Sequence, residues 1–220
     1  FELDLNGWLS DLVYREHSYK KIIVGGKVRG QSYHGRLIVE DSCLNLDFNG
    51  LVDFNGLQPV FDFSLDLDNV FLNDLKLSER GGFNNLSGEF EGHFKGMDTE
   101  AFYGAFLADN VHYTENDSEY SLKHFELSRT PTGNGFPDSI RIRSDYLDVD
   151  AEADFVLMKL LSQLKDLAIG EDLDDQQKMA MEQDPQYVAF NFRFKDVSPL
   201  TELFFPEMRI APGTNIYGQY

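Results

Sequence analysis

Apolar and polar residues alternate along most of this chain, and the alternation predicts β-strands. In the run from Phe61 to Leu67 every second residue is apolar, which places the apolar side chains on one face of an extended strand. Asn55-Gly56 predicts the clearest hairpin turn, with strands on either side of it. The same period recurs, with turn-forming residues between the runs, over residues 22–39, 44–54, 60–67, 86–96, 102–113, 120–128 and 140–155.

Two stretches, 61–90 and 190–220, share one order of features. Each has an alternating aromatic strand, then a short segment that we interpret as a helical crossover, then a strand with glycine. The crossovers are predicted at 69–74 and at Ser198–Phe205, the second with Ser198 as N-cap and Pro199 at the first helical position. They are expected to carry the chain over one edge of the sheet. A repeated unit favours an array over a single catalytic pocket.

Helical periodicity interrupts the strands once. Apolar residues recur at three- and four-residue spacing from Val156 to Ala168, and a more polar helix is predicted over 172–183, before Asp184-Pro185. We therefore divide the chain into a β-meander or groove unit at 1–155, a helical insertion at 156–186 and the start of a further β-groove repeat at 187–220. Because alternation reaches both ends, we interpret the chain as a piece of a longer protein.

The strand from Leu86 to Gly96 places glycine and bulky residues in turn on one face. Glycines let strands bend, and rings pack over the bare backbone. The predicted fold class is therefore mainly β: an elongated, curved antiparallel sheet with a small helical insertion.

Composition narrows the possible partners. Acidic residues outnumber basic ones by 38 to 19, giving a net charge of −19, which argues against binding to nucleic acid and against adsorption on anionic lipid through a basic patch. The 30 aromatic residues, of which 19 are Phe, indicate a folded chain. Cys43 is the single cysteine, so an internal disulfide is excluded. The sequence shows neither a signal peptide nor an apolar run of the roughly 20 residues that span a bilayer.

A search for catalytic patterns predicts that the protein is not an enzyme. The sequence has no GxSxG, P-loop, GxGxxG or HExxH motif. Acidic residues alternate with apolar ones over Leu147–Phe155, which is typical of a solvated face, and Asp172–Asp175 lacks the spacing of an EF-hand loop. Neither a cofactor nor a metal is expected. The histidines are scattered singly and predicted to face solvent: His17, His34, His93, His112 and His124.

The aromatic face admits two interpretations. It is either the core of a closed sheet pair or the open concave face of a curved sheet that holds acyl chains, and periodicity alone does not separate them. In the second interpretation the groove-lining residues are Phe61, Phe63, Leu65, Leu67, Leu86, Phe90, Phe94, Val149, Phe190, Phe192 and Phe194. In the first, the protein is a closed β-sandwich for binding or adhesion, including glycan binding on the polar face through Tyr33, Tyr103 and Tyr120.

Several segments, in order along residues 40–220, resemble the TamB family, the large periplasmic subunits of the translocation and assembly module within the AsmA-like superfamily. The segments are Phe48–Gly56, Pro59–Asp68, Leu86–Phe94, Ile140–Asp150, Phe194–Asp196, Phe204–Glu207 and Ile210–Thr214. Each segment alone carries little information, and the resemblance rests on the order in which they occur.

The resemblance implies a Gram-negative envelope protein that is anchored in the inner membrane and extends through the periplasm as a taco-like repeating β-groove. It implies phospholipid acyl chains as ligands, an outer-membrane β-barrel assembly protein of the Omp85 type as partner, and a role in phospholipid transport or in outer-membrane protein assembly and secretion. It supplies no catalytic residues. The helical insertion departs from a plain β-repeat.

Overall fold

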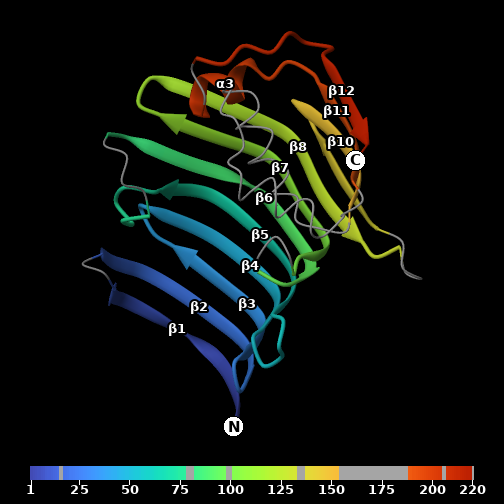
Figure 1. The fold of residues 1–220 in the computed structure, drawn as a ribbon. Helices are drawn as coiled ribbons and strands as arrows, with labels where there is room; N and C mark the ends of the chain where they lie inside the picture. The colour runs from blue at the N-terminus through green and yellow to red at the C-terminus, as the bar shows by residue number, and fades with distance from the viewer. Residues whose placement is uncertain are drawn as a thin grey trace, which may run out of the picture. The chain divides into compact units, whose positions relative to one another are not determined.

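The protein is described by a computed structural model that covers residues 1–14, 17–77, 82–97, 101–132, 137–153, 188–204 and 207–219. Within these residues, twelve strands are hydrogen-bonded in sequence order into one sheet (Figure 1). Each neighbouring pair from β1 to β6 and from β9 to β12 is antiparallel. The predicted mainly-β fold with a curved antiparallel sheet is therefore confirmed. The predicted helical insertion at 156–186 lies outside the described residues, and the boundaries assigned to it stay predictions.

The elements follow the predicted runs closely. The strands are β1 Glu2–Tyr14, β2 His17–Arg29, β3 Ser32–Glu40, β4 Leu44–Asp53, β5 Val60–Phe71, β6 Asn84–Lys95, β7 Tyr103–Glu115, β8 Ser118–Thr130, β9 Asp138–Ser144, β10 Leu147–Ala153, β11 Val188–Phe194 and β12 Asn215–Gln219, and the helix is α3 Ser198–Phe204.

The chain forms two compact units. Unit 1 comprises 1–95 and 105–126, and so holds β1 to β6 with most of β7 and β8. Unit 2 comprises 96–104 and 127–220, and holds β9 to β12 and α3.

The predicted hairpin between β4 and β5 is confirmed by their antiparallel register. Asn55 acts differently from a simple turn residue, because its side chain ties this loop to the neighbouring β2–β3 turn. Its Oδ1 accepts from the amide of Gln31 at 3.0 Å and its Nδ2 donates to the carbonyl of Arg29 at 3.0 Å. The amide therefore fixes two loops at the same end of unit 1.

The two predicted crossovers have different outcomes. The helix at Ser198–Phe204 is confirmed, but the carboxylate of Asp196, rather than the Ser198 hydroxyl, accepts the first free amide hydrogen, that of Ser198, at 3.1 Å. The helix at 69–74 is wrong: β5 continues to Phe71 and a hydrogen-bonded turn over 72–77 follows it. Neither segment carries the chain across the sheet, because β5 pairs directly with β6 and β11 with β12.

The two copies of the repeat also differ in strand register. In the second copy Gly218 lies opposite Phe190, the first aromatic residue of its strand. In the first copy the corresponding Gly88 lies opposite Leu67, six residues beyond Phe61 on β5. The shared sequence pattern therefore encodes the same element order with a different pairing.

The register in unit 1 assigns each paired residue to one of the two faces of the sheet. Residues that lie opposite each other in neighbouring strands share a face, and one face of β1 to β6 collects apolar side chains and glycines row by row. We call this surface the apolar face. Among the paired residues on this face of these six strands none is charged: they are Leu3, Leu5, Gly7, Leu9, Val13, Ser18, Ile22, Val24, Gly26, Val28, Tyr33, Gly35, Leu37, Val39, Leu44, Leu46, Phe48, Gly50, Val52, Phe61, Phe63, Leu65, Leu67, Val70, Leu86, Gly88, Phe90, Gly92 and Phe94. Asp11 and Lys20, which follow the same alternation in β1 and β2 outside the paired register, form an ion pair at 3.4 Å.

The described strands of the protein belong to a single sheet. A closed sandwich needs two sheets whose inner faces interdigitate. The expectation of a closed β-sandwich is therefore not met in the described residues.

Candidate functional site

A row of aromatic rings crosses five strands on the apolar face of unit 1. The ring centroids are 6.3 Å apart between Tyr33 and Phe48, 5.7 Å between Phe48 and Phe63, and 6.4 Å at each of the next two steps, to Phe94 and to Phe106. We call these five residues the aromatic row. The spacings lie in the range at which aromatic pairs attract one another, so the row is a continuous surface from β3 to β7.

Three of the predicted lining residues, Phe61, Leu65 and Phe90, lie directly beside this row, and Leu65 lies opposite Phe48. Phe61 stacks on Phe94 at 4.8 Å, and Phe90 stacks on Phe106 at 6.3 Å. Leu65 lies opposite Phe90, and Leu67 opposite Gly88. Leu86 lies further along the same face, opposite Val70, beyond a register shift in β5. The structure thus brings all seven predicted residues of unit 1 onto one surface.

Three members of the aromatic row, Tyr33, Phe48 and Phe106, were not predicted as lining residues. Tyr33 was expected on the polar face as a sugar platform, but its register partners Val28 and Val52 place it on the apolar face. Its hydroxyl lies within hydrogen-bonding distance of two carbonyl oxygens, those of Arg36 at 2.9 Å and Gly25 at 3.2 Å, which share its single proton. Alternation in β3 and β4 shows that each strand has two faces, but only the pairing register shows which face continues the one that carries the phenylalanines.

Glycines beside the aromatic row let the strands approach each other closely. A Cβ on Gly35 would lie 2.1 Å from the carbonyl oxygen of Gly25, and one on Gly50 would lie 2.5 Å from the Cα of Phe63. Gly50 also has a φ of 153°, which side-chain-bearing residues rarely adopt. The ring of Phe63 covers Gly92, where a Cβ would lie 2.5 Å from the ring. The predicted packing of rings over bare glycine is confirmed here.

The apolar face of unit 1 is incompletely covered. Phe61, Phe63, Leu65, Phe90 and Phe94 are each half-buried, whereas the phenylalanines of a sealed core are almost wholly buried. On the opposite face of β5 the alternate residues are exposed. Apolar side chains on this surface therefore keep contact with whatever medium or ligand lies over it.

The four predicted lining residues of unit 2 divide into two kinds. Val149 and Phe192 lie opposite each other in β10 and β11 and are only 0% and 3% exposed, so they are core residues of this unit. Phe190 and Phe194 are half-buried and flank Phe192 along β11, with ring centroids 5.5 Å and 6.4 Å from its ring. The exposed part of the predicted lining thus lies mainly in unit 1.

The polar face of unit 1 carries ion pairs and aligned acids. The guanidinium of Arg36 binds Asp47, and this hydrogen bond holds the pKa of the Asp47 carboxyl below its usual value. Asp47, Asp66 and Glu89 lie opposite one another in β4, β5 and β6. Aligned like charges repel, so this face is suited to water rather than to an anionic surface.

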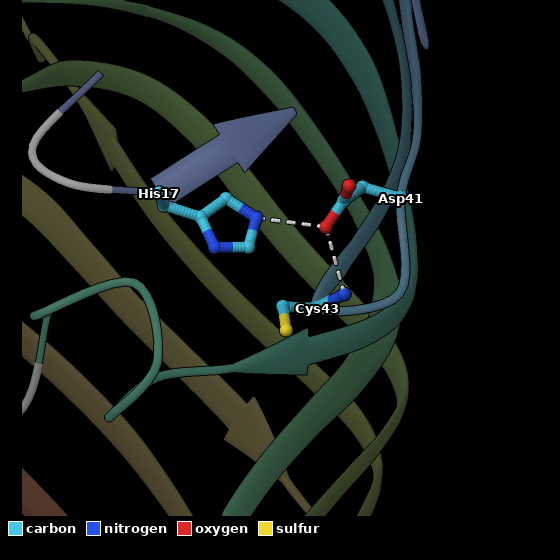
Figure 2. A group of neighbouring side chains, drawn as sticks. All are labelled: His17, Asp41 and Cys43. Carbon is cyan, nitrogen blue, oxygen red and sulfur yellow. Dashed lines mark hydrogen bonds and ion pairs between the residues drawn. The ribbon is translucent and has the colours of Figure 1, made fainter. Parts of the chain in front are cut away.

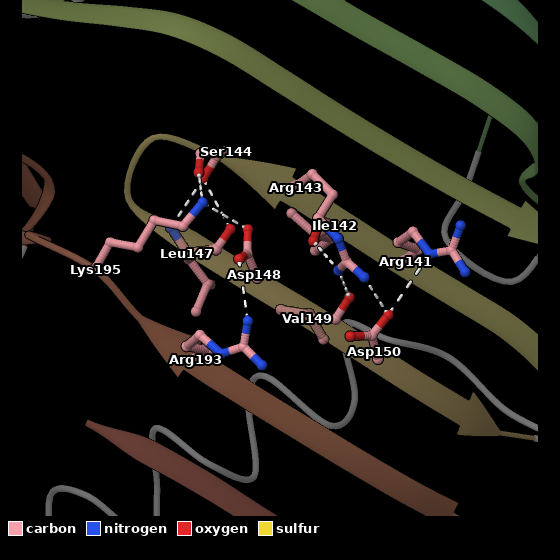
Figure 3. A network of polar contacts seen from close by, with 10 residues as sticks. All are labelled: Arg141, Ile142, Arg143, Ser144, Leu147, Asp148, Val149, Asp150, Arg193 and Lys195. Atoms are coloured by element: carbon pink, nitrogen blue, oxygen red, sulfur yellow. Dashed lines mark hydrogen bonds and ion pairs between the residues drawn. The ribbon is translucent and has the colours of Figure 1, made fainter. Parts of the chain in front are cut away.

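Two acids of β10, Asp148 and Asp150, belong to a polar network in unit 2 (Figure 3). The predicted solvated face applies to Asp150, whose side chain is 53% exposed, more than to Asp148, at 14%. Lys195 donates to Asp148 at 2.8 Å and to the carbonyl of Ser144 at 2.6 Å, while Arg193 lies 4.0 Å from Asp148. Asp150 pairs with Arg143 and Arg141. These carboxylates are engaged by cations, which disfavours a paired-acid hydrolytic site as well as a free acidic surface.

Tyr103, another residue that was expected to bind sugars, belongs to a second polar cluster in unit 2. Its hydroxyl donates to Asp138 at 2.7 Å, and this hydrogen bond raises the pKa of Tyr103. Arg129 donates to the same carboxylate at 2.8 Å and lies 4.5 Å from the Tyr103 ring centroid. Tyr120, the third expected platform, stacks on Tyr113 at 6.2 Å in unit 1.

One constellation in unit 1 went unrecognised in the sequence: His17, Asp41 and Cys43 converge, with one potential ligand atom from each within 4.8 Å of the others (Figure 2). His17 was expected to face solvent, but its Nε2 lies 2.8 Å from Asp41 Oδ1 and its side chain is only 18% exposed. Burial alone would raise the pKa of Asp41, but hydrogen bonds from Cys43, His17 and Lys20 outweigh it and lower that pKa. The pairing of β2 with β3 brings these distant residues together.

Cys43 in this cluster is unsuited to act as a nucleophile. Burial raises the pKa of its thiol, and the neighbouring Asp74 carboxylate adds to the effect. The thiol donates to Asp74 Oδ2 at 3.4 Å. Because the thiolate is the reactive form, this environment suppresses the chemistry that a Cys–His pair supports in thiol enzymes.

Comparisons with family models, with curated proteins and with solved structures found no match for the chain. Among the described residues, no helix combines the length and apolar character needed to cross a membrane.

Proposed function

We propose that the apolar face of unit 1 is a lipid-binding β-groove, in which acyl chains of phospholipids lie along the aromatic row. One observation carries the proposal: the row is continuous over five strands, half-buried, and lies on a face without a charged residue among the paired positions of β1 to β6. The role is one of binding rather than catalysis.

The size of the row suits one acyl chain. Five adjacent strands span four gaps of about 4.8 Å, or about 19 Å, whereas one leaflet of hydrocarbon measures about 15 Å, half of the roughly 30 Å bilayer core. Each methylene removed from water contributes about 0.8 kcal/mol. Binding of this kind needs no specific polar group at the apolar face, and the headgroup remains in water.

The cellular role follows from the family resemblance. We propose a periplasmic segment of an envelope protein anchored in the inner membrane, which serves phospholipid transport or the assembly and secretion of outer-membrane proteins. An outer-membrane β-barrel assembly protein of the Omp85 type is the proposed partner. The aligned acids on the polar face support a role in which that face stays in water.

Photo-crosslinking from neighbouring positions of β6 tests the groove. A benzoylphenylalanine at Phe90 keeps an aromatic side chain on the apolar face, and the same group at Glu91 points to the polar face as a matched control. With phospholipid vesicles of phosphatidylethanolamine and phosphatidylglycerol, we expect crosslinked lipid from position 90 and little from position 91.

Native mass spectrometry of the purified chain complements the crosslinking. Bound phospholipid that is reduced in a Phe90→Asp variant supports the groove, provided that circular dichroism shows the β-sheet of the variant intact. Equal crosslinking from positions 90 and 91, or none from either in a folded protein, would overturn the proposal.

A further inference from the structure

Three potential metal ligands of different chemical types meet at one end of unit 1. His17 begins β2, while Asp41 and Cys43 lie in the turn between β3 and β4. They supply an imidazole nitrogen, a carboxylate oxygen and a thiol sulfur, all within 4.8 Å of one another. Figure 2 shows the three residues, with Asp41 between His17 and the backbone nitrogen of Cys43. Ligands of mixed nitrogen, oxygen and sulfur type suit zinc and related transition metals, whereas calcium and magnesium prefer oxygen alone.

The carboxylate at the centre is held firmly in place. The Asp41 side chain is only 1% exposed. The backbone amides of Cys43 and Lys20 each donate to it, to Oδ1 and Oδ2 respectively, at 3.0 Å. An ionised carboxylate has about four acceptor positions, so these two amides orient Asp41 without exhausting it. Ligands fixed in this way lose little conformational freedom when they bind an ion.

The spacing of the ligand atoms is close to that of a tetrahedral site. Zinc binds nitrogen and oxygen at about 2.0–2.1 Å, which separates two such ligands by about 3.3 Å in a tetrahedron. His17 Nε2 and Asp41 Oδ1 now lie 2.8 Å apart, so an ion that replaced the shared proton would open this contact by about half an ångström. The Cys43 sulfur lies within 4.8 Å of both atoms, whereas a zinc-bound sulfur lies about 3.5 Å from a nitrogen or oxygen ligand of a tetrahedral site, so binding draws the three groups together.

A fourth ligand is within reach. Asp74 lies in the turn after β5, and its Oδ2 is 3.4 Å from the Cys43 sulfur. The exposed position of Asp74 also leaves the site open to solvent on one side.

We propose that His17, Asp41 and Cys43 form a binding site for a divalent transition-metal ion of the zinc type, with Asp74 or water as the fourth ligand. The thiolate is the form of cysteine that binds a metal, so the Cys43 thiol releases its proton to solvent as the ion binds. A bound ion would link the start of β2 to the β3–β4 turn, and so cross-link the ends of these strands in unit 1. The inference is independent of lipid binding, because none of the four residues belongs to the aromatic row.

Cobalt(II) titration of the purified chain is the direct test, because a cobalt–thiolate bond gives a charge-transfer band in the near ultraviolet. We expect one equivalent to bind with this band and zinc to displace it. Cys43→Ser abolishes the band, and His17→Gln weakens binding by about tenfold or more. The matched control is His93→Gln, because His93 also lies 2.8 Å from an aspartate, Asp62, but has no cysteine beside it. It leaves the titration unchanged.

Thermal unfolding gives a second measurement that does not depend on the band. An ion that binds only the folded chain raises the unfolding temperature. We expect zinc to do so in the wild type and in His93→Gln, and to do so much less in His17→Gln. The proposal is overturned if the folded wild type shows no charge-transfer band, or if His17→Gln and His93→Gln bind cobalt equally well.

Discussion

The two units treat the same sequence pattern differently. Unit 1 and unit 2 each contain strands in which phenylalanine occupies alternate positions, Phe61 and Phe63 on β5 and Phe190 and Phe192 on β11. In unit 1 these phenylalanines are half-buried, whereas in unit 2 Phe192 is 3% exposed and packs opposite the fully buried Val149. Alternation thus determines which side chains share a face, but it does not determine what covers that face.

One ion pair from each unit shows the same contrast in exposure. In unit 2, Arg129 and Asp138 form an ion pair with side chains 7% and 16% exposed. In unit 1, the pair of Lys21 and Glu40 remains 47% and 53% exposed. Unit 2 thus encloses an ion pair of two charged side chains, whereas the Lys21–Glu40 pair of unit 1 lies in solvent.

The largest expected effect compares one phenylalanine from each unit. Phe192→Ala removes a ring from a closed core, and we expect it to lower the free energy of unfolding by about 3–5 kcal/mol. Phe90→Ala removes a half-buried ring, and the smaller area withdrawn from water predicts about 1–2 kcal/mol. Urea denaturation followed by circular dichroism measures both. Equal losses would mean that the apolar face of unit 1 is sealed in solution, and the comparison would fail.

A second test uses the charges. Asp138→Ala leaves the guanidinium of Arg129 buried without its carboxylate, and we expect a loss of about 3 kcal/mol, near the lower end for a broken buried pair because Tyr103 stays beside it. Glu40→Ala removes an exposed partner, for which about 0–1 kcal/mol is expected. Both variants are measured by urea denaturation at low and at 0.5 M salt. A marked loss in Glu40→Ala that salt abolishes would show that the surface pairs of unit 1 matter more than their exposure indicates.

The sequence predicted the strands well because each strand needs only local information. The alternation over 60–67 and the turn residues at 55 and 56 sufficed to place β4, β5 and the hairpin between them. The helix expected at 69–74 failed because Val70 continues the apolar face after an irregularity in strand pairing. Such an irregularity depends on the neighbouring strand and leaves no period in the sequence.

Only part of the candidate site could be predicted, because the rest depends on how the strands pair. Phe63 and Phe94 were identified by their alternation, but the aromatic row also needs Tyr33, Phe48 and Phe106, which join it only through the pairing of strands. The His17–Asp41 contact spans 24 positions and was invisible for the same reason. Properties that arise from one strand were predictable, and properties that arise between strands were not.

The smallest expected effect concerns the close approach of β2 and β3 on the apolar face of unit 1. Gly35→Ala places a Cβ 2.1 Å from the carbonyl oxygen of Gly25 and 2.5 Å from the Cα of Gly26, and backbone atoms cannot move aside as a flexible side chain can. We expect the free energy of unfolding to fall by about 1–3 kcal/mol.

Gly7→Ala is the matched control on the same face, since a Cβ there meets nothing within 4 Å. A glycine in a strand costs about 0.5–1 kcal/mol relative to alanine, so this variant should be neutral or slightly more stable. Urea denaturation of the two variants decides the point. If both variants lose the same stability, crowding by the backbone of β2 is not what requires glycine at position 35, and the contrast between a crowded and an open glycine on this face fails.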